Sequence, residues 1–237
     1  MTIQNPIILA LDVPSAEQAL HLVKLLHPVV GAFKVGKELY VSAGPDIVRS
    51  IRATGANVFL DLKFHDIPNT VAKAIDASTR LDVQMLTIHA CGGSSMMKAA
   101  EEAAQNTARS LNRPPPLILG VTVLTSMDAS QFSELGIHGS IESQVGRLAN
   151  LAVTAGLRGL VCSPLEIDLL RKQIPDHIQL ITPGIRPATS ELGDQKRVMT
   201  PADALRAGAT WLVIGRPIYD SSDPVAAAKS ILKSLSL

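Results

Sequence analysis

The feature of this sequence that most constrains its fold is a repeated alternation of short β-type runs with longer helical segments. The short runs are rich in Ile, Leu and Val, and the segments between them have the apolar spacing of amphipathic helices. This order predicts a parallel sheet, because parallel strands need a long crossover between them. The predicted strands are residues 7–13, 32–36, 58–63, 85–90, 117–125, 159–163, 178–184 and 211–215.

Eight strands within 237 residues favour one closed (β/α)8 barrel, the TIM barrel, over an open doubly wound sheet, which usually has fewer strands. No stretch has the character of a linker between domains, so residues 1–237 are expected to form a single barrel domain. The open sheet remains the alternative. The predicted helices are residues 15–26, 45–53, 69–80, 94–105, 141–155, 201–207 and 224–235.

The composition excludes several classes of partner. Hydrophobic residues make up 46% of the chain and charged residues 18%, which is typical of a folded protein with a large core. The net charge is +1 and no basic run could follow a nucleic-acid backbone. The sequence shows neither a signal-peptide pattern nor a membrane span, so we expect a cytoplasmic protein. Cys91 and Cys162 lack metal-site spacing and are expected to be reduced core residues.

Charged residues interrupt the third predicted strand where apolar residues would be expected. The run "VFLDLKFHDIPNT" places Asp61, Lys63 and Asp66 within six residues. Because side chains alternate along a strand, Asp61 and Lys63 should share the face of Phe59 and point into the barrel mouth. A buried ion pair that only holds the barrel together is the structural alternative, but such pairs contribute little net stability.

Two neighbouring strands carry charges at the same level. Asp12 ends the first strand in "LALDV", and Lys34 ends the second in "FKVG". Taken singly, Asp12 could cap a helix and Lys34 could extend its amine to solvent. Together with the third strand they form an alternating array of three carboxylates and two ammonium groups, each sign stabilising the other in a partly dry cleft.

A second cluster follows the last two strands, where barrels commonly bind phosphate. "TPGIRP" contains Arg186 and "IGRP" contains Gly215 and Arg216, so each arginine stands beside glycine backbone. Gln195, in the loop between them, could add a neutral donor. An isolated arginine would more simply be a solvated surface charge, but two at this place predict a phosphate site.

The motifs "LALDV", "FKVG", "DLKFHDIPNT", "LTS", "TPGIR", "GDQKR" and "IGRP" occur in this order over nearly the whole chain. In this the sequence resembles the orotidine 5′-phosphate decarboxylase family. The resemblance implies decarboxylation of orotidine 5′-monophosphate to UMP and CO2 without a cofactor or metal, as the last step of de novo pyrimidine nucleotide synthesis. It also implies a homodimer of barrels with active sites at the interface.

The resemblance also implies roles for the charged residues. Lys63 matches the lysine that protonates C6 of the pyrimidine, and Asp61 matches the carboxylate that faces the substrate carboxylate. Asp66 and Thr70 match residues that reach the neighbouring subunit's site. Lys34 matches a residue that extends the charge array and holds the ribose hydroxyls.

The remaining matched positions bind the substrate. Asp12 corresponds to a second residue that holds the ribose hydroxyls, while Thr125 and Ser126 correspond to the pair that contacts the pyrimidine. The residues that correspond to the phosphate site of the family are Arg186, Gln195, Gly215 and Arg216.

Two other functions remain open. A metal-dependent decarboxylase or aldolase of a sugar phosphate would share the Asp-x-Lys-x-x-Asp strand. Those enzymes resemble one another in having an acidic residue on the second strand that helps to bind Mg²⁺, whereas Lys34 places a positive charge there that would repel the ion. A non-catalytic nucleotide-binding barrel would not need an ammonium and two carboxylates held together. His89 is expected to be a core histidine rather than a catalytic one, and His65 an orienting residue rather than an acid or base.

Overall fold

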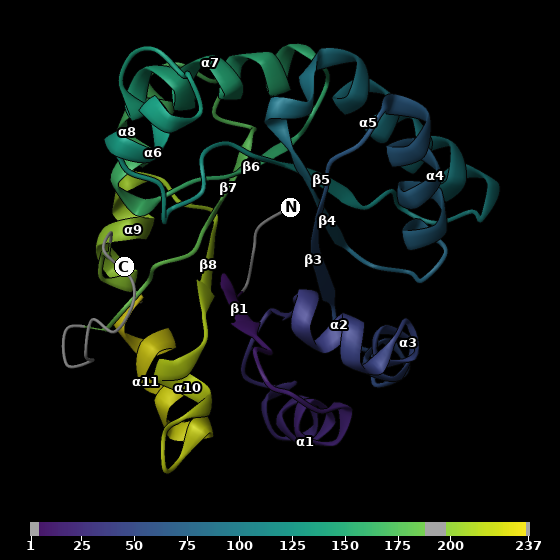
Figure 1. Cartoon of the computed structure of the whole chain (residues 1–237). Helices are drawn as coiled ribbons and strands as arrows, with labels where there is room; N and C mark the ends of the chain where they lie inside the picture. The colour runs from purple at the N-terminus through teal and green to yellow at the C-terminus, as the bar shows by residue number, and fades with distance from the viewer. Residues whose placement is uncertain (1–4, 188–197, 236–237) are drawn as a thin grey trace.

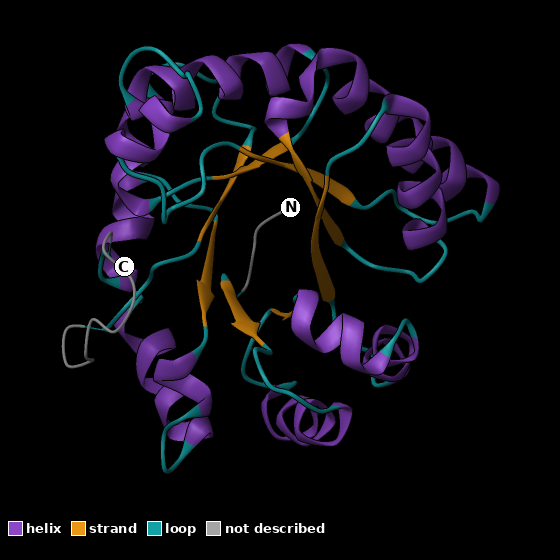
Figure 2. Cartoon of the chain, viewed as in Figure 1, coloured by secondary structure: helices purple, strands orange, loops and turns teal. Residues whose placement is uncertain are grey.

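The computed structural model describes residues 5–187 and 198–235, and all eight predicted strands are present in it as one closed parallel barrel. Each strand pairs with the next in chain order, and β8 returns to pair with β1. The strands form the inner ring and the helices the outer ring (Figures 1 and 2). The strands are β1 (Ile7–Ala10), β2 (Ala32–Val35), β3 (Val58–Phe64), β4 (Met85–His89), β5 (Leu117–Val121), β6 (Gly159–Val161), β7 (Gln179–Thr182) and β8 (Trp211–Ile214). The predicted barrel is confirmed.

Every predicted helix is present, although its ends shift by a few residues. The predicted helices correspond to α1 (Ala16–Leu26), α3 (Asp46–Ala53), α4 (Pro68–Thr79), α5 (Gly93–Ser110), α7 (Ile141–Thr154), α9 (Pro201–Ala207) and α11 (Pro224–Ser234). The sequence prediction missed several helices of seven residues or fewer. These are α2 (Lys37–Ala43), α6 (Ala129–Glu134), α8 (Ile167–Arg171), α10 (Arg216–Tyr219) and two 3₁₀ turns at Ala90–Gly92 and Pro164–Glu166.

Side-chain oxygens fix where several helices begin after the barrel strands. Ser15 accepts a hydrogen bond from the backbone of Gln18 at the start of α1, and Ser140 does the same for Ser143 at α7. Asp128 forms a reciprocal capping pair with Gln131 at α6. Such caps satisfy N–H groups that the first helical turn leaves unpaired.

Two hydrophobic layers follow from the period of two along each strand. One set of strand residues fills the barrel interior and the alternate set packs against the helices. In β3, Phe59 points inward, whereas Val58 and Leu60 face the helices, as the alternation predicts. The interior layer consists of Ile8, Ala32, Phe59, Met85, Leu117, Leu119 and Ile181, with Val161, Trp211 and Val213 packed against it.

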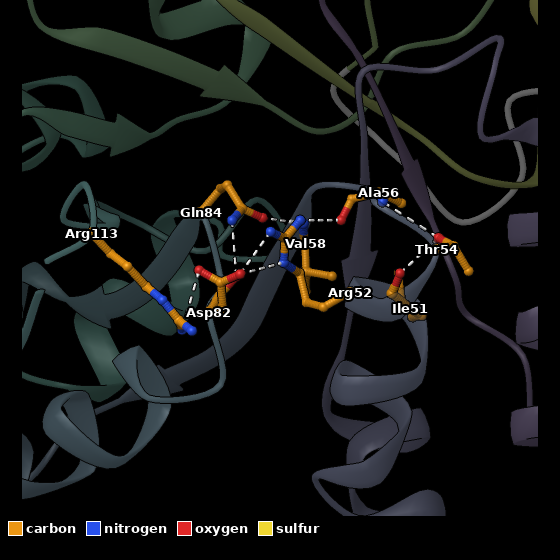
Figure 3. Close-up of polar contacts among 8 residues, drawn as sticks. All are labelled: Ile51, Arg52, Thr54, Ala56, Val58, Asp82, Gln84 and Arg113. Carbon is orange, nitrogen blue, oxygen red and sulfur yellow. Dashed lines mark hydrogen bonds and ion pairs between the residues drawn. The ribbon is translucent and has the colours of Figure 1, made fainter. Parts of the chain in front are cut away.

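A polar network lies beside the starts of β3 and β4, opposite the carboxyl ends of the strands (Figure 3). The Arg52 guanidinium on α3 donates to the Asp82 carboxylate at 2.7 and 3.2 Å and to the Ala56 carbonyl at 2.5 Å. Gln84 accepts from the backbone N–H of Val58 at 2.7 Å and donates to the Asp82 carbonyl at 2.8 Å. These bonds tie α3 to the starts of β3 and β4.

Across the part of the chain that the structure describes, no helix is both long enough and apolar enough to cross a membrane.

Candidate active site

A cavity of about 330 Å³ opens at the carboxyl ends of the barrel strands. This is the end of a barrel at which active sites are built, and the volume is that of a small-molecule site. Most of the predicted site residues line it, namely Asp12, Lys34, Asp61, Lys63, Thr125, Ser126, Arg186, Gly215 and Arg216. Gln195 lies outside the described residues, and Asp66 and Thr70 do not line the cavity.

Four of the five predicted charges form one continuous chain of ion pairs. The Lys34 ammonium lies 2.9 Å from Asp12 Oδ1 and 3.9 Å from Asp61 Oδ2. The Lys63 ammonium donates to both carboxylate oxygens of Asp61, each at 2.8 Å. The order Asp12, Lys34, Asp61, Lys63 therefore alternates in sign across the cavity floor.

Asp61 is the centre of this chain and the most enclosed of its carboxylates, with a side chain 12% exposed. Burial by itself raises the pKa of Asp61, but the ammonium groups of Lys63 and Lys34 and the hydrogen bonds from Lys63 and Thr87 outweigh it. The pKa of Asp61 therefore falls below its ordinary value, and the group is a carboxylate at neutral pH. The site thus holds a fixed negative charge between two fixed positive ones.

The backbone of β3 forms a β-bulge in the segment that contains Lys63. Leu60 pairs with Leu86 and the next pair joins Phe64 to Ile88, so β3 advances four residues while β4 advances two. Within this bulge Lys63 adopts a φ of 53°, in the left-handed region. For a residue with a side chain this conformation costs roughly 1–2 kcal/mol, and such residues cluster at functional sites.

Gly36 leaves room for the other lysine. A Cβ atom at this position would lie 3.1 Å from the Lys34 ammonium and 3.4 Å from Asp12 Oδ1. The backbone of Gly36 has an ordinary negative φ, so the requirement is for space rather than for conformational freedom. The glycine that ends the motif "FKVG" therefore leaves space beside the ion pair between Lys34 and Asp12, where a Cβ atom would crowd the Lys34 ammonium.

The two predicted phosphate-binding arginines lie at the same cavity. Arg186 is buried with 8% exposure, and its backbone N–H bonds to the Met199 carbonyl at 3.0 Å. Arg216 is exposed and begins α10 directly after Gly215.

The sequence analysis missed Tyr219, whose ring also lines the cavity and lies against Gly215. A tyrosine three residues after an arginine has no distinctive pattern by which it could have been found.

Cys162 is buried and lines the cavity, as expected of a core residue. Burial raises its pKa to about 12, with the Glu166 carboxylate adding to the effect, so it is not a thiolate nucleophile near neutral pH. The prediction that Cys91 is a core residue is wrong: Cys91 is exposed, in the turn that follows β4.

The two histidines next to the site lie against one another. The rings of His65 and His89 lie 5.6 Å apart at a tilt of 50°. His89 is only half buried, because it ends β4 at the barrel rim, so its expected place in the core is wrong. Partial burial, together with nearby positive charge from His65 and Lys63, lowers the pKa of His89. Among the described residues, no group of three or more His, Cys, Asp or Glu side chains is arranged to hold a metal ion.

Asp66 and Thr70 belong to an exposed segment beyond β3. Residues 65–70 are all exposed, and Ile67 is 65% exposed. The Asp66 carboxylate accepts the backbone N–H of Ile67 at 2.6 Å and forms no ion pair with any described residue. The fifth predicted charge therefore stands apart from the array within this single chain.

The fold and the charged cavity at the carboxyl ends of the strands define a (β/α)8-barrel enzyme. The sequence model of the orotidine 5′-phosphate decarboxylase / HUMPS family matches residues 5–231, so the chain belongs to this family. It is 55% identical to orotidine 5′-phosphate decarboxylase of Opitutus terrae over 97% of each chain. It is 51% identical to that of Moorella thermoacetica, over 100% of this chain and 94% of the relative.

A solved structure is similar as well. The crystal structure of orotidine 5′-phosphate decarboxylase from Lactobacillus acidophilus superposes with a TM-score of 0.87 at 37% identity, over 99% of this chain and 100% of the other.

Proposed function

We propose that the cavity converts orotidine 5′-monophosphate into UMP and CO2, with Lys63 stabilising and then protonating a carbanion at C6. The activity itself, orotidine 5′-phosphate decarboxylation in pyrimidine nucleotide synthesis, is that of relatives 55% and 51% identical over nearly the whole chain. The observation that carries the assignment of Lys63 is its ammonium, held on both oxygens of Asp61 at the cavity floor.

The chemistry explains why such an ammonium is needed. When the bond from C6 to the carboxylate breaks, CO2 leaves and its electron pair stays in an sp² orbital that the pyrimidine π system cannot delocalise. A cation fixed beside C6 stabilises this pair as it forms. One N–H proton of Lys63 then passes to C6 to give UMP, and the neutral amine regains a proton from water.

Asp61 has two effects in this scheme. It holds the Lys63 ammonium in place through two hydrogen bonds of 2.8 Å. As a carboxylate it also repels the substrate carboxylate, by about 4 kcal/mol at roughly 4 Å and an effective dielectric of about 20. The repulsion is relieved when CO2 forms, so it favours bond cleavage.

The other lining residues bind the rest of the nucleotide. Lys34 and Asp12, paired at 2.9 Å, are assigned to the ribose hydroxyls, and Thr125 and Ser126 to the pyrimidine. The cavity lining also includes apolar side chains, which limit the access of water to the developing charge. They include Phe59, Val121, Val123, Val161 and Val213.

We expect turnover without a metal ion or an organic cofactor. The family description also covers HUMPS enzymes, and a metal-dependent sugar-phosphate reaction was the alternative considered above. The Lys34 ammonium, 2.9 Å from Asp12 and 3.9 Å from Asp61, already neutralises the carboxylates that a cation would need.

The assay that tests this follows the loss of orotidine 5′-monophosphate absorbance after dialysis against EDTA. The expected rate is unchanged by EDTA and by added Mg²⁺. Activity that disappears with EDTA and returns only with Mg²⁺ would favour the metal-dependent alternative.

Arg216→Ala should weaken ligands that carry the phosphate and spare those that do not. A charge-assisted hydrogen bond contributes about 1.5–3 kcal/mol, so the affinity for UMP is expected to fall roughly tenfold to a hundredfold. Uridine binding should stay within about threefold. Calorimetric titration of both ligands measures this, with Arg49→Ala, an exposed arginine on α3, as the matched control. An equal loss of affinity for uridine would contradict the assignment.

We further propose a homodimer in which Asp66 and Thr70 reach the neighbouring cavity. Three features support this arrangement: the exposure of residues 65–70, the apolar Ile67 among them, and the lack of an ion pair between Asp66 and any residue that the structure describes. Val41 on α2, after the adjacent strand β2, is 83% exposed and adds apolar surface at the same end of the barrel. A cytoplasmic location stays a prediction from the sequence.

A further inference from the structure

The bulge between β3 and β4 places one buried polar side chain opposite the segment that carries Asp61 and Lys63. This residue is Thr87, which is fully buried and does not line the cavity. Met85, two residues earlier, belongs to the barrel interior, so the period of two directs Thr87 inward just below the cavity floor. A buried hydroxyl needs partners, and both partners of this one belong to the proposed catalytic pair.

The Thr87 hydroxyl oxygen accepts a hydrogen bond from the backbone N–H of Lys63 at 2.9 Å. The same oxygen lies 2.9 Å from Asp61 Oδ1 and donates its proton to it. Because Asp61 is a carboxylate and the Lys63 N–H can only donate, the direction of both bonds is fixed. The single proton of Thr87 must point to Asp61.

These bonds close a ring that begins and ends in Lys63. Its backbone N–H donates to Thr87, Thr87 donates to Asp61, and Asp61 Oδ1 accepts from the Lys63 ammonium at 2.8 Å. The ring therefore fixes both ends of the lysine against one carboxylate. It also provides a partner for the Lys63 N–H at the point where the ladder to β4 is broken and the φ of Lys63 is 53°.

We propose that Thr87 is a positioning residue for the decarboxylation, whose hydroxyl holds the strained backbone of Lys63 and the carboxylate of Asp61 in one geometry. This inference rests on the proposed role of Lys63. Thr87 touches no substrate; it acts by keeping the ammonium at a fixed place relative to C6. Because small displacements of a reacting group can reduce rates about a hundredfold, the loss should fall on turnover rather than on binding.

The experiment compares Thr87→Val, which removes the hydroxyl at nearly constant volume, with Thr87→Ser, which keeps it. The matched control is Thr79→Val on α4, another buried threonine, whose hydroxyl donates to the Ile75 carbonyl at 2.8 Å away from the cavity. Each variant is measured for kcat, for KM, for UMP affinity and for melting temperature. Thr87→Cys, which keeps a weak donor of similar size, serves if Thr87→Val does not fold.

We expect Thr87→Val to lower kcat about tenfold to a hundredfold while UMP affinity stays within about threefold. Thr87→Ser should recover kcat to within about threefold of wild type, and Thr87→Cys should remain at least fivefold below it. Thr79→Val should have a lower melting temperature than wild type but an unchanged kcat. Wild-type kcat in Thr87→Val, or in Thr87→Cys if that variant is needed, would overturn this inference and leave the proposed function intact. An inactive wild-type enzyme would instead overturn the proposed function.

Discussion

Lys63→Ala is expected to abolish decarboxylation while leaving the binding of UMP within about an order of magnitude of wild type. The variant removes both the cation that stabilises the electron pair at C6 and the proton that quenches it. A general acid contributes about 10² to 10⁴ in rate, and a preorganised charge about 10² to 10³ more. We therefore expect kcat to fall at least about ten-thousandfold, or roughly 5.5 kcal/mol in barrier height.

The measurement combines single-turnover kinetics on orotidine 5′-monophosphate with a separate titration of UMP. Lys98→Ala on α5 is the matched control, because its side chain is 70% exposed and forms only a 3.9 Å ion pair with Glu102. Because Lys63→Ala removes the ammonium that pairs with Asp61, circular dichroism is used to check that the variant is still folded. Turnover near the wild-type rate in Lys63→Ala would contradict the assignment of the proton donor.

The size of this expected loss follows from the energetics of the site. Enzymes lower barriers by up to roughly 23 kcal/mol in ordinary cases, and a repulsion of about 4 kcal/mol between two carboxylates supplies only part of such a reduction. Most of the stabilisation must come from charges that are already in place before the bond breaks. The chain of pairs from Asp12 to Lys63 provides this, because contacts of 2.8–3.9 Å fix the Lys34 ammonium between Asp12 and Asp61 and the Lys63 ammonium against Asp61.

The sequence was sufficient to predict the barrel and most of the cavity because both depend on a simple period. Inward and outward residues alternate from Val58 to Leu60, and extending this period placed Asp61 and Lys63 at the mouth, where both line the cavity. The bulge itself has no such signal, since "VFLDLK" reads the same with a regular ladder. The left-handed φ of Lys63 and the part played by Thr87 were therefore not predictable from the pattern.

The sequence analysis also missed or misplaced residues whose role depends on their three-dimensional surroundings rather than on a sequence pattern. Thr87 is a common β-strand residue, and only its two hydrogen bonds distinguish it from a packing residue. Cys91 was expected in the core because cysteines are usually buried, but it follows the end of β4 and is exposed. Asp66 lies apart from the charge array among the described residues, and a pattern within one chain does not reveal which chain's cavity it enters.

A mixed dimer of Lys63→Ala and Asp66→Ala protomers should regain about half of the wild-type activity, although each variant alone should be inactive. If Asp66 acts in the neighbouring cavity, one site of the mixed dimer has an intact Lys63 and receives an intact Asp66 from the other protomer. The second site carries both substitutions. Co-expression with two different affinity tags isolates the mixed species, and its turnover of orotidine 5′-monophosphate is the measurement.

The control dimer pairs Lys63→Ala with Asp61→Ala. These two residues are bonded to one another at 2.8 Å within a single cavity, so each site of that dimer keeps one defect and stays inactive. If Asp66 acted within its own chain, the Lys63→Ala and Asp66→Ala dimer would be inactive for the same reason. The difference between the two dimers therefore reports which chain supplies the fifth charge, since both contain the same number of substitutions. An inactive mixed dimer, or the failure to isolate one, would contradict the proposed sharing of Asp66.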